Sequence, residues 1–399
     1  MPLKDILSEK AQKFIKDHEA HDPFSLALQA DKYPDLPVRD LAEQIASKRK
    51  AKKKLPAWYA CEGIIFPPKL SMEQCSSELT AKYKAGLVSG DRMADITGGS
   101  GVDTFYLSKS FRHADYVEVN PALAEITEHN LKALGADNVD CHTGDGLVFI
   151  ENSETTYDCI YLDPARRSDA GRKVYALEDC TPDIVKEKDK LLEKSEKVLV
   201  KTAPLMDIDR AVDDLGCVSK VWVVSSENEC KEVLYLLEKE ADNEPEIIAV
   251  DIQPNGTVRE LSFTRKGEKD ISTNLSEPDA YLYEPNPAVM KAGAFKSVAD
   301  KFGLGKLHQH SHLYTGPDFL PDFPGRKFEL IGTCTVDRKA LKSILPEGKA
   351  NVVTRNFPQS AENIKKKLKL KDGGNTFVFA TTLLDGKKAL LVCRRVLGL

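Results

Sequence analysis

Short apolar runs alternate with helical segments from residue 91 onward. Six runs have the length and composition of buried strands: RMADIT, ADYVEV, NVDCHT, YDCIYLD, KVLVKT and KVWVVSS. Between them, the spacing of apolar residues predicts helices near residues 103–110, 121–134 and 178–194. This alternation is typical of a parallel β-sheet with crossover helices, so the pattern predicts an α/β fold for this part of the chain.

Strand-like segments continue beyond the sixth run. CKEVLYLL is a candidate seventh strand, and IIAVDIQ-PNG-TVRELSFT has the pattern of a β-hairpin that turns at Asn255-Gly256. The following stretch, ISTNLSEPDAYLYEPNP, contains many Pro, Ser, Asn and Asp residues. These residue types favour turns and loops, so we expect a domain boundary there.

The two ends of the chain have different patterns. Residues 1–88 are predicted to be helical, and Ser71 to Gln74 form a candidate capping box before the segment ELTAKYKAGL. Near the C-terminus, the strand NVVTR, the helix SAENIKKKLKL and the hairpin NTFVFATTLL-DG-KKALLVCRR predict a compact α+β domain. We therefore expect four parts: a helical region at 1–88, the α/β domain at 89–268, a small α/β insert or linker domain at 269–325, and the C-terminal domain at 326–399.

The length and composition indicate a globular protein of several domains. The chain has 399 residues, of which 41% are hydrophobic, and this length exceeds that of one ordinary hydrophobic core. It contains no apolar run of about 18 residues, and its first segment lacks an apolar signal region. We therefore expect a cytoplasmic protein that neither spans a membrane nor is secreted.

The cysteines give no sign of a structural framework. There are nine, without a C-x-x-C pair and with irregular spacing. This pattern argues against both a set of disulfides and a structural zinc site. We expect the thiols to be reduced and most of them to be buried.

Charge is distributed unevenly along the chain. Residues 326–399 contain 16 Lys and Arg against 6 Asp and Glu, whereas residues 1–325 contain 41 against 56. The basic C-terminal part favours contact with a polyanion such as RNA or DNA, with a solvated lysine surface as the alternative. The run KRKAKKK at 48–54 is expected on a solvated helix or linker.

The segment ADITGGSGVDT, residues 94–104, places three glycines after an acidic strand end. Glycines at such a turn let the backbone approach a bound cofactor. A loop that binds a nucleoside triphosphate needs a Lys-Ser/Thr pair after its last glycine, and Val102-Asp103 stands there instead. A dinucleotide fingerprint would place Thr104 where Gly or Ala is preferred. On these glycines alone, a dinucleotide and S-adenosylmethionine both remain open.

Acidic residues end four successive strands: Asp95, Glu118, Asp145 and Asp163. Ligands of open α/β sheets bind at the carboxyl ends of the strands, so these four side chains are expected along one ligand-binding edge. Four carboxylates would repel a pyrophosphate but would attract a sulfonium cation. An Asp at a strand end also commonly caps the next helix, and for Asp145 taken singly we favour that role.

Residues 90–235 resemble the class I S-adenosylmethionine-dependent methyltransferases. The resemblance rests on D-I-T-G-G-S-G after the first strand, Glu118 after the second, G-D-G after the third and D-P-A-R after the fourth. The whole chain resembles bacterial class I methyltransferases with a C-terminal THUMP-like domain, through LPAW, EQCSSELTAKYKA and RNFPQSAENIKKKLKLKDGG. This resemblance implies a Rossmann-like sheet, S-adenosylmethionine as the cofactor and, through the THUMP-like domain, an RNA substrate such as tRNA or rRNA.

The motifs place the candidate site residues. In an acid-Pro-x-x turn, a carboxylate can accept hydrogens from an exocyclic amine, and this assigns the catalytic role to Asp163 and Pro164. Arg166 and Arg167 are candidates for binding a substrate phosphate, with internal salt bridges as the alternative. The resemblance implies cofactor binding by Asp95, Thr97, Gly98, Gly99, Gly101, Asp103, Glu118, Asp145 and Asp163.

Departures from known patterns limit the chemistry. Adenine is one possible acceptor among several, because Ala165 and Arg166 stand where adenine amine methylases carry an aromatic residue. Methylation at C5 of a pyrimidine is not expected, since Lys201-Thr-Ala-Pro204 lacks a nucleophilic cysteine. The first hypothesis is therefore an RNA methyltransferase that acts on an exocyclic amine. The alternatives are a non-catalytic RNA- or ribosome-binding protein with this fold, or a methyltransferase for proteins or small molecules.

Three histidines alternate in LHQHSHLY at positions 308, 310 and 312. On a strand, they would share one face with their rings about 6 to 7 Å apart, too far to hold one ion together. We expect a polar surface strand and no metal site.

Overall fold

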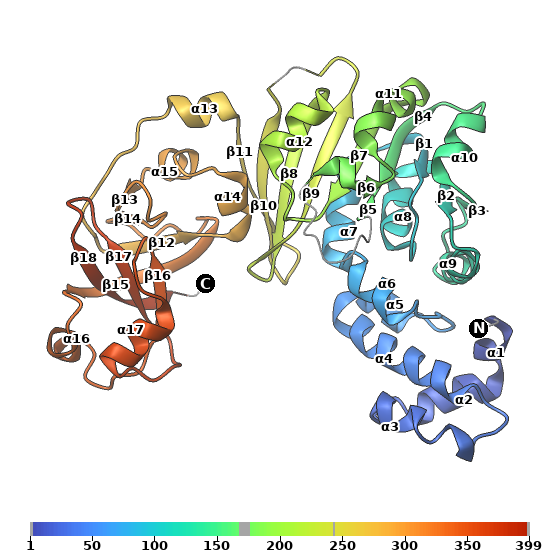
Figure 1. Cartoon of the computed structure of the whole chain (residues 1–399), viewed down its shortest axis with the longest axis horizontal. Helices are drawn as coiled ribbons and strands as arrows, with labels where there is room; N and C mark the ends of the chain where they lie inside the picture. The colour runs from blue at the N-terminus through green and yellow to red at the C-terminus, as the bar shows by residue number, and fades with distance from the viewer. Residues whose placement is uncertain (1–2, 167–175, 242–243, 397–399) are drawn as a thin grey trace. The chain divides into compact units, whose positions relative to one another are not determined.

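The computed structural model describes residues 3–166, 176–241 and 244–396 and divides the chain into two compact units. Unit 1 consists of Met1–Ser219 and Val233–Asn243, and unit 2 consists of Lys220–Glu232 and Glu244–Leu399. Figure 1 labels the helices and strands along the chain. Among the described residues, no helix combines the length and apolar composition needed to cross a bilayer.

The N-terminal part of unit 1 is helical, as predicted. Its core contains Leu41, Ile45 and other apolar residues from several of these helices. The helices are α1 (Leu3–Leu7), α2 (Glu9–Asp17), α3 (Pro23–Ala27), η1 (Ala30–Lys32), α4 (Val38–Lys54), α5 (Pro56–Ala60), α6 (Lys69–Gln74) and α7 (Glu78–Ala85).

One local expectation for this helical part needs correction. Ser71 lies inside α6, and it is the side chain of Ser77 that caps α7 by accepting from the backbone N–H of Thr80 at 3.2 Å. The KRKAKKK run lies on helix α4, in agreement with the expected helix. Two of its lysines also contact other segments: Lys48 pairs with Glu19 at 2.9 Å, and the Lys54 ammonium donates to the Met72 carbonyl oxygen at 2.9 Å.

The remainder of unit 1 is the predicted α/β sheet. Its strands follow the order β9-β7-β4-β1-β2-β3. All neighbours from β7 to β3 are parallel, while β9 is antiparallel to β7. Sequence order runs in opposite directions on the two sides of β1, and such a reversal is where ligands bind in open α/β sheets. The strands are β1 (Gly90–Asp95), β2 (Phe111–Glu118), β3 (Val139–Thr143), β4 (Tyr157–Leu162), β7 (Ser195–Thr202) and β9 (Glu229–Glu238).

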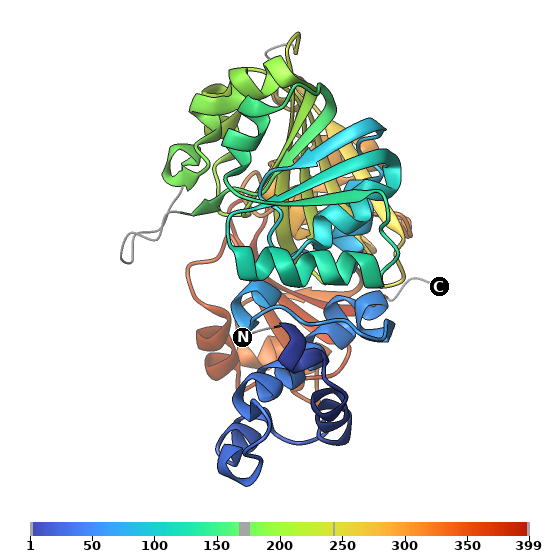
Figure 2. The same ribbon diagram turned by 90° about the vertical axis from the view of Figure 1, so that its right-hand side faces the viewer.

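Crossover helices connect the parallel strands of unit 1. They include α9 (Pro121–Ala133), whose Asn130 amide exchanges hydrogen bonds of 2.9 and 2.7 Å with the Ile65 backbone and so ties α9 to the N-terminal helical part. Figure 2 shows α9 between the sheet and the N-terminal helices. The other elements are α8 (Val102–Leu107), η2 (Ser108–Ser110), α10 (Gly146–Asn152), β5 (Ala165–Arg166), η3 (Leu177–Asp179), β6 (Cys180–Thr181), α11 (Ile184–Lys194) and α12 (Ile208–Leu215).

Unit 2 begins with the predicted hairpin. Strand β10 (Glu246–Ile252) lies parallel to β8 (Val218–Ser226) and antiparallel to β11 (Val258–Phe263). Gly256 turns the hairpin with a φ of +85°, a conformation that favours glycine. Helix α13 (Arg265–Asp270) follows.

Strands from residues 281–316 and 325–396 form one further sheet in unit 2. Its order is β13-β14-β12-β15-β18-β17-β16. Phe328 and Phe379 are buried in its core. The strands are β12 (Tyr281–Pro285), β13 (Gly305–Lys306), β14 (Tyr314–Gly316), β15 (Gly325–Cys334), β16 (Asn351–Arg355), β17 (Thr376–Thr382) and β18 (Lys388–Val396), and the helices are α14 (Pro287–Ala292), α15 (Ser297–Phe302), α16 (Arg338–Ile344) and α17 (Ala361–Leu368).

All nine cysteines are free. We expected most of them to be buried, but most are partly exposed. Only Cys159, Cys180 and Cys393 are buried, and the other six are partly exposed.

Candidate active site

The glycine loop between β1 and α8 packs closely against β2 and α9. A Cβ atom on Gly98 would lie 2.1 Å from a ring carbon of Tyr116, and one on Gly101 would lie 2.4 Å from the methyl group of Thr127. Gly101 also has a φ of +72°, which disfavours residues with a side chain. The loop therefore needs these two glycines for its own packing.

Hydrogen bonds hold the backbone of Gly99 at both its carbonyl oxygen and its N–H group. Its carbonyl oxygen accepts from the hydroxyls of Tyr116 at 2.6 Å and Thr127 at 3.1 Å. Its N–H donates to the Glu118 carboxylate at 2.9 Å, and the other Glu118 oxygen accepts from the backbone N–H of Asn120 at 2.8 Å. Glu118 thus joins the carboxyl end of β2 to the glycine loop and fixes the shape of both.

Asp95 supports the loop from inside the protein. It is only 1% exposed, and its two oxygens accept from the backbone N–H of Thr97 at 3.1 Å and the Thr104 hydroxyl at 2.6 Å. Burial raises the pKa of Asp95 to about 7, although both hydrogen bonds oppose that shift. Asp95 therefore changes charge near neutral pH.

Asp145 has the capping role favoured above. It is the N-cap of α10, and one of its oxygens accepts from the backbone N–H groups of Leu147 and Val148 at 2.9 and 3.2 Å. The next residue, Gly146, packs against β1: a Cβ there would lie 2.1 Å from the Ile96 carbonyl oxygen. The G-D-G turn is thereby held against the start of the glycine loop.

Asp163 follows the last residue of β4 and is anchored at two points. Its backbone N–H donates to the Thr97 hydroxyl at 2.7 Å, which joins it to the glycine loop. Its carboxylate forms a close ion pair with the Lys201 ammonium. The Asp163 side chain is 38% exposed and that of Lys201 only 10%, so the carboxylate faces solvent while its cation lies inside the protein.

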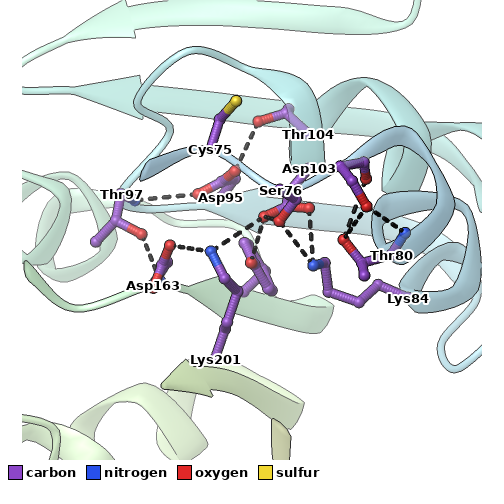
Figure 3. A network of polar contacts seen from close by, with 12 residues as sticks. Cys75, Ser76, Thr80, Lys84, Asp95, Thr97, Asp103, Thr104, Asp163 and Lys201 are labelled. Carbon is purple, nitrogen blue, oxygen red and sulfur yellow. Dashed lines mark hydrogen bonds and ion pairs between the residues drawn. The ribbon is translucent and has the colours of Figure 1, made fainter. Parts of the chain in front are cut away.

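A buried charge network lies behind Asp163 (Figure 3). At its centre, the Asp103 carboxylate lies 3.1 Å from the ammonium of Lys84, which is fully buried, and 3.7 Å from that of Lys201. It also accepts from the hydroxyls of Ser76 and Tyr161, each at 2.8 Å. Burial opposes ionisation of Asp103, but Lys84 and Lys201 outweigh it and hold its pKa at about 2. Asp103 is therefore a carboxylate at neutral pH.

The segment after Asp163 is only partly described. Residues Ala165 and Arg166 form β5, which pairs with β6 through Ala165 opposite Thr181 and Arg166 opposite Cys180. Arg167 lies outside the described residues, as does the side chain of Arg166. Their predicted contact with a substrate phosphate therefore stays a prediction.

The predicted cofactor residues lie at the carboxyl ends of β1, β2, β3 and β4. Among them, Glu118, Asp145 and Asp163 offer carboxylates that can accept from hydroxyl or amino groups and attract a cation. The lysines of the network, Lys84 and Lys201, both pair with carboxylates, so they do not make this edge basic. The chemistry of these groups fits a nucleoside with a sulfonium charge better than it fits a phosphate.

Four members of the charge network were not anticipated: Ser76, Lys84, Tyr161 and Lys201. Ser76 and Lys84 belong to the helical part, and Tyr161 and Lys201 lie on neighbouring strands. A lysine one residue before the end of an apolar strand, as in KVLVKT, was the available signal for Lys201. The role of Lys201 depends on which carboxylates lie beside it in the folded protein.

The histidine segment does not form the strand that was expected. Residues 308–312 lie in a turn between β13 and β14, and His312 has a φ of +49°. The His312 ring packs against Phe295 in a tilted arrangement with centroids 3.9 Å apart, and burial lowers the pKa of His312 to about 4. Within the described ranges, no three His, Cys, Asp or Glu side chains gather in a way that could hold a metal ion.

Three segments of the chain match known protein families. Residues 70–168 match the protein-L-isoaspartate(D-aspartate) O-methyltransferases. Residues 281–324 match a ferredoxin-like domain, and residues 325–395 match a THUMP-like domain. The first match contains the glycine loop, Glu118, Asp145 and Asp163.

Other proteins are similar to this one over most of its length. A crystal structure of a Porphyromonas gingivalis W83 protein, described as a methyltransferase without a stated substrate, is 33% identical, with 99% of each chain covered and a TM-score of 0.88. Two Mycobacterium tuberculosis proteins, from strains CDC 1551 and H37Rv, are named S-adenosylmethionine-dependent methyltransferases. Each is 23% identical over 338 residues, which cover 81% of this chain and 87% of the relative.

Proposed function

The chain belongs to the class I S-adenosylmethionine-dependent methyltransferases with a C-terminal THUMP-like domain, and on this premise we propose that it methylates RNA at an exocyclic amine of a base. Membership in this family gives the reaction class and the cofactor. The acceptor, the RNA and the roles of single residues are the content of the proposal, with tRNA or rRNA as the expected RNA.

We assign cofactor binding to the carboxyl ends of the parallel strands. S-adenosylmethionine supplies an electrophilic methyl group, which an acceptor nitrogen takes in line while the electron pair of the broken bond stays on sulfur. Glu118 and Asp145 are suited to accept from the hydroxyl and amino groups of its nucleoside. In this assignment, the residues that contact the nucleoside are Thr97, Gly98, Gly99, Gly101, Glu118 and Asp145, and Asp163 lies beside the methyl group. The carboxylates of Asp95 and Asp103 contribute from inside the protein by holding the loop and the charge network.

The observation that carries the proposal is the partly exposed carboxylate of Asp163 beside the glycine loop. There it can accept a hydrogen bond from an amine and so aim the nitrogen lone pair at the methyl group. Once the new bond has formed, the nitrogen carries a positive charge, and a proton leaves it through Asp163 or water. Pro164 shapes the turn that presents this carboxylate.

The C-terminal domain supports RNA as the substrate. Residues 326–399 carry a net charge of +10, and the THUMP-like match covers residues 325–395. On and just after α17, Lys366, Lys367, Lys369 and Lys371 are exposed. Exposed lysines of this kind bind phosphates without reading sequence, so they suit delivery of RNA to the enzyme.

The proposal is tested with the purified full-length chain and Asp163→Ala. We expect the wild type to transfer labelled methyl groups to RNA from cells that lack the gene, and Asp163→Ala to lose at least about 10²-fold in rate. Calorimetry should give both proteins similar affinities for S-adenosylhomocysteine. Methylation at the wild-type rate by Asp163→Ala would refute the assigned role. Transfer to protein but not to RNA would refute the substrate.

A further inference from the structure

We propose that Lys201 is a positioning residue for methyl transfer, which holds the Asp163 carboxylate so that one of its oxygens faces the acceptor amine. This inference rests on the proposed role of Asp163. Lys201 acts through Asp163 and does not itself touch the substrate, because 90% of its side chain is covered by the protein.

The sheet sets the distance between these two residues. Strands β4 and β7 are parallel neighbours, with Leu162 opposite Val200. The next residue along the chain is Asp163 directly after β4 and Lys201 on β7. The Lys201 ammonium donates to Oδ2 of Asp163, and we assign the other oxygen, Oδ1, to the acceptor amine.

Asp103 fixes the position of the Lys201 ammonium from the other side. Its Oδ2 lies 3.7 Å from the Lys201 nitrogen, and its Oδ1 lies 3.1 Å from the Lys84 nitrogen. Lys84 also donates to the Ser76 hydroxyl at 2.8 Å. Two lysines and two carboxylates thus alternate in the order Lys84, Asp103, Lys201, Asp163, and their formal charges balance.

Burial makes this arrangement rigid. A buried ammonium without a carboxylate is costly, so Lys201 cannot turn away from Asp103 and Asp163 without a large penalty. The second anchor of Asp163, its backbone N–H on Thr97, ties the same residue to the glycine loop. The carboxylate therefore has few orientations available, and a misplacement of about 1 Å at such a position can cost a factor of about 10² in rate.

The test uses Lys201→Met, which keeps the length of the side chain but removes its charge, and Lys201→Arg, which keeps the charge. Lys197→Met is the matched control, because Lys197 lies on the same face of β7 four residues earlier. For each purified full-length chain, the measurements are kcat for methyl transfer to RNA from cells without the gene, and affinity for S-adenosylhomocysteine.

We expect Lys201→Met to lower kcat roughly 10²-fold, while the affinity for S-adenosylhomocysteine changes by less than about 3-fold. Lys201→Arg should recover part of the rate, since it retains a cation in a different geometry. Lys197→Met should match the wild type. A Lys201→Met enzyme with the wild-type kcat would overturn the inference while leaving the proposed function intact.

A double variant separates positioning from a general loss of structure. If Lys201 acts through Asp163, then Lys201→Met added to Asp163→Asn should lower kcat no further than Asp163→Asn alone. If the loss of kcat in the double variant equals the product of the losses in the two single variants, the inference is overturned. This comparison also decides the case if Lys201→Met alone binds S-adenosylhomocysteine poorly, because the double variant removes the two opposite charges together. Full activity of Asp163→Asn would instead refute the role assigned to the charge of Asp163, and absence of transfer to RNA by the wild type would refute the proposed function.

Discussion

At the scale of single residues, Asp95 and Asp103 show how position in the fold separates the pKa values of two acidic side chains on either side of one loop. Asp95 has only hydroxyl and amide donors, so burial dominates and its pKa rises to about 7. Asp103 is also buried, but two lysines hold its pKa at about 2. The two carboxylates therefore titrate in different pH ranges, which makes their effects on stability separable.

Asp95 should give the protein a pH-dependent stability. The folded protein keeps a proton on Asp95 up to a pH of about 7, whereas the unfolded chain releases it at a pH of about 4. This contribution to the free energy of unfolding is therefore present at low pH and is lost as pH rises from about 4 to about 7, by at most about 1.4 kcal/mol per pH unit.

The Asp95→Asn variant isolates this contribution, because Asn keeps the shape of the side chain and does not titrate. Urea unfolding at pH 5, 6, 7 and 8 should show that the wild type loses stability relative to Asp95→Asn up to about pH 7 and then levels off. The titration of Asp103 lies below this range. A constant difference between the two proteins across these pH values would contradict the assignment.

Sequence patterns identified the acidic strand ends and the glycines of the site but not its lysines. Each acidic residue and each glycine can be recognised from its own short segment, because it lies at or just after the end of an apolar strand. Lys84 and Lys201, in contrast, acquire their roles from pairing with Asp103, which lies 19 residues from Lys84 and 98 residues from Lys201 in the sequence. Pairing over that distance depends on the three-dimensional fold, so one sequence alone did not reveal it.

At the scale of elements, the glycine loop depends on its packing against β2 and α9. Gly101 and Gly135 have nearly equal φ angles of +72° and +73°. They differ in their surroundings: a Cβ on Gly101 would lie 2.4 Å from the Thr127 methyl, whereas none of the described atoms lies within 4 Å of the corresponding position at Gly135. The two glycines therefore allow backbone strain and side-chain crowding to be measured separately.

We expect Gly135→Ala to lower the free energy of unfolding by about 1 to 2 kcal/mol, from the left-handed backbone alone. Gly101→Ala should lose about 1 to 3 kcal/mol more, because the added methyl group collides with Thr127. Urea unfolding measures both. Adding Thr127→Ser, which removes the Thr127 methyl but keeps the hydroxyl, should restore most of that excess. Equal losses for the two Ala variants would contradict the packing argument.

The strands were predictable because their apolar runs are buried on a sheet of the expected kind. All seven candidate strands of the α/β region and the hairpin that follows are confirmed. Helix α10 was missed because GLVFIEN is short and mainly apolar, which resembles a strand. The histidine strand was wrong: Ser311 donates to the distant Thr382 carbonyl oxygen at 2.9 Å, and this contact helps to hold a turn.

At the scale of the whole molecule, charge and domain content point to the same substrate class. The acidic first 325 residues contain the candidate catalytic site, while the THUMP-like match covers most of the basic segment from 326 onward. A basic segment can hold RNA through its phosphates, whereas in the proposed reaction the catalytic edge accepts a sulfonium and an amine. The proposed function therefore needs both parts, the basic segment to bind RNA and the acidic part to transfer the methyl group.

The most direct test of this account is mass spectrometry of nucleosides from total RNA of three strains. One strain lacks the gene, one is complemented with the wild type, and one is complemented with Asp163→Ala. We predict that one nucleoside methylated on an exocyclic amine disappears without the gene, returns with the wild type and stays absent with Asp163→Ala. Identical methylated nucleosides in all three strains would contradict the claim that this chain methylates RNA.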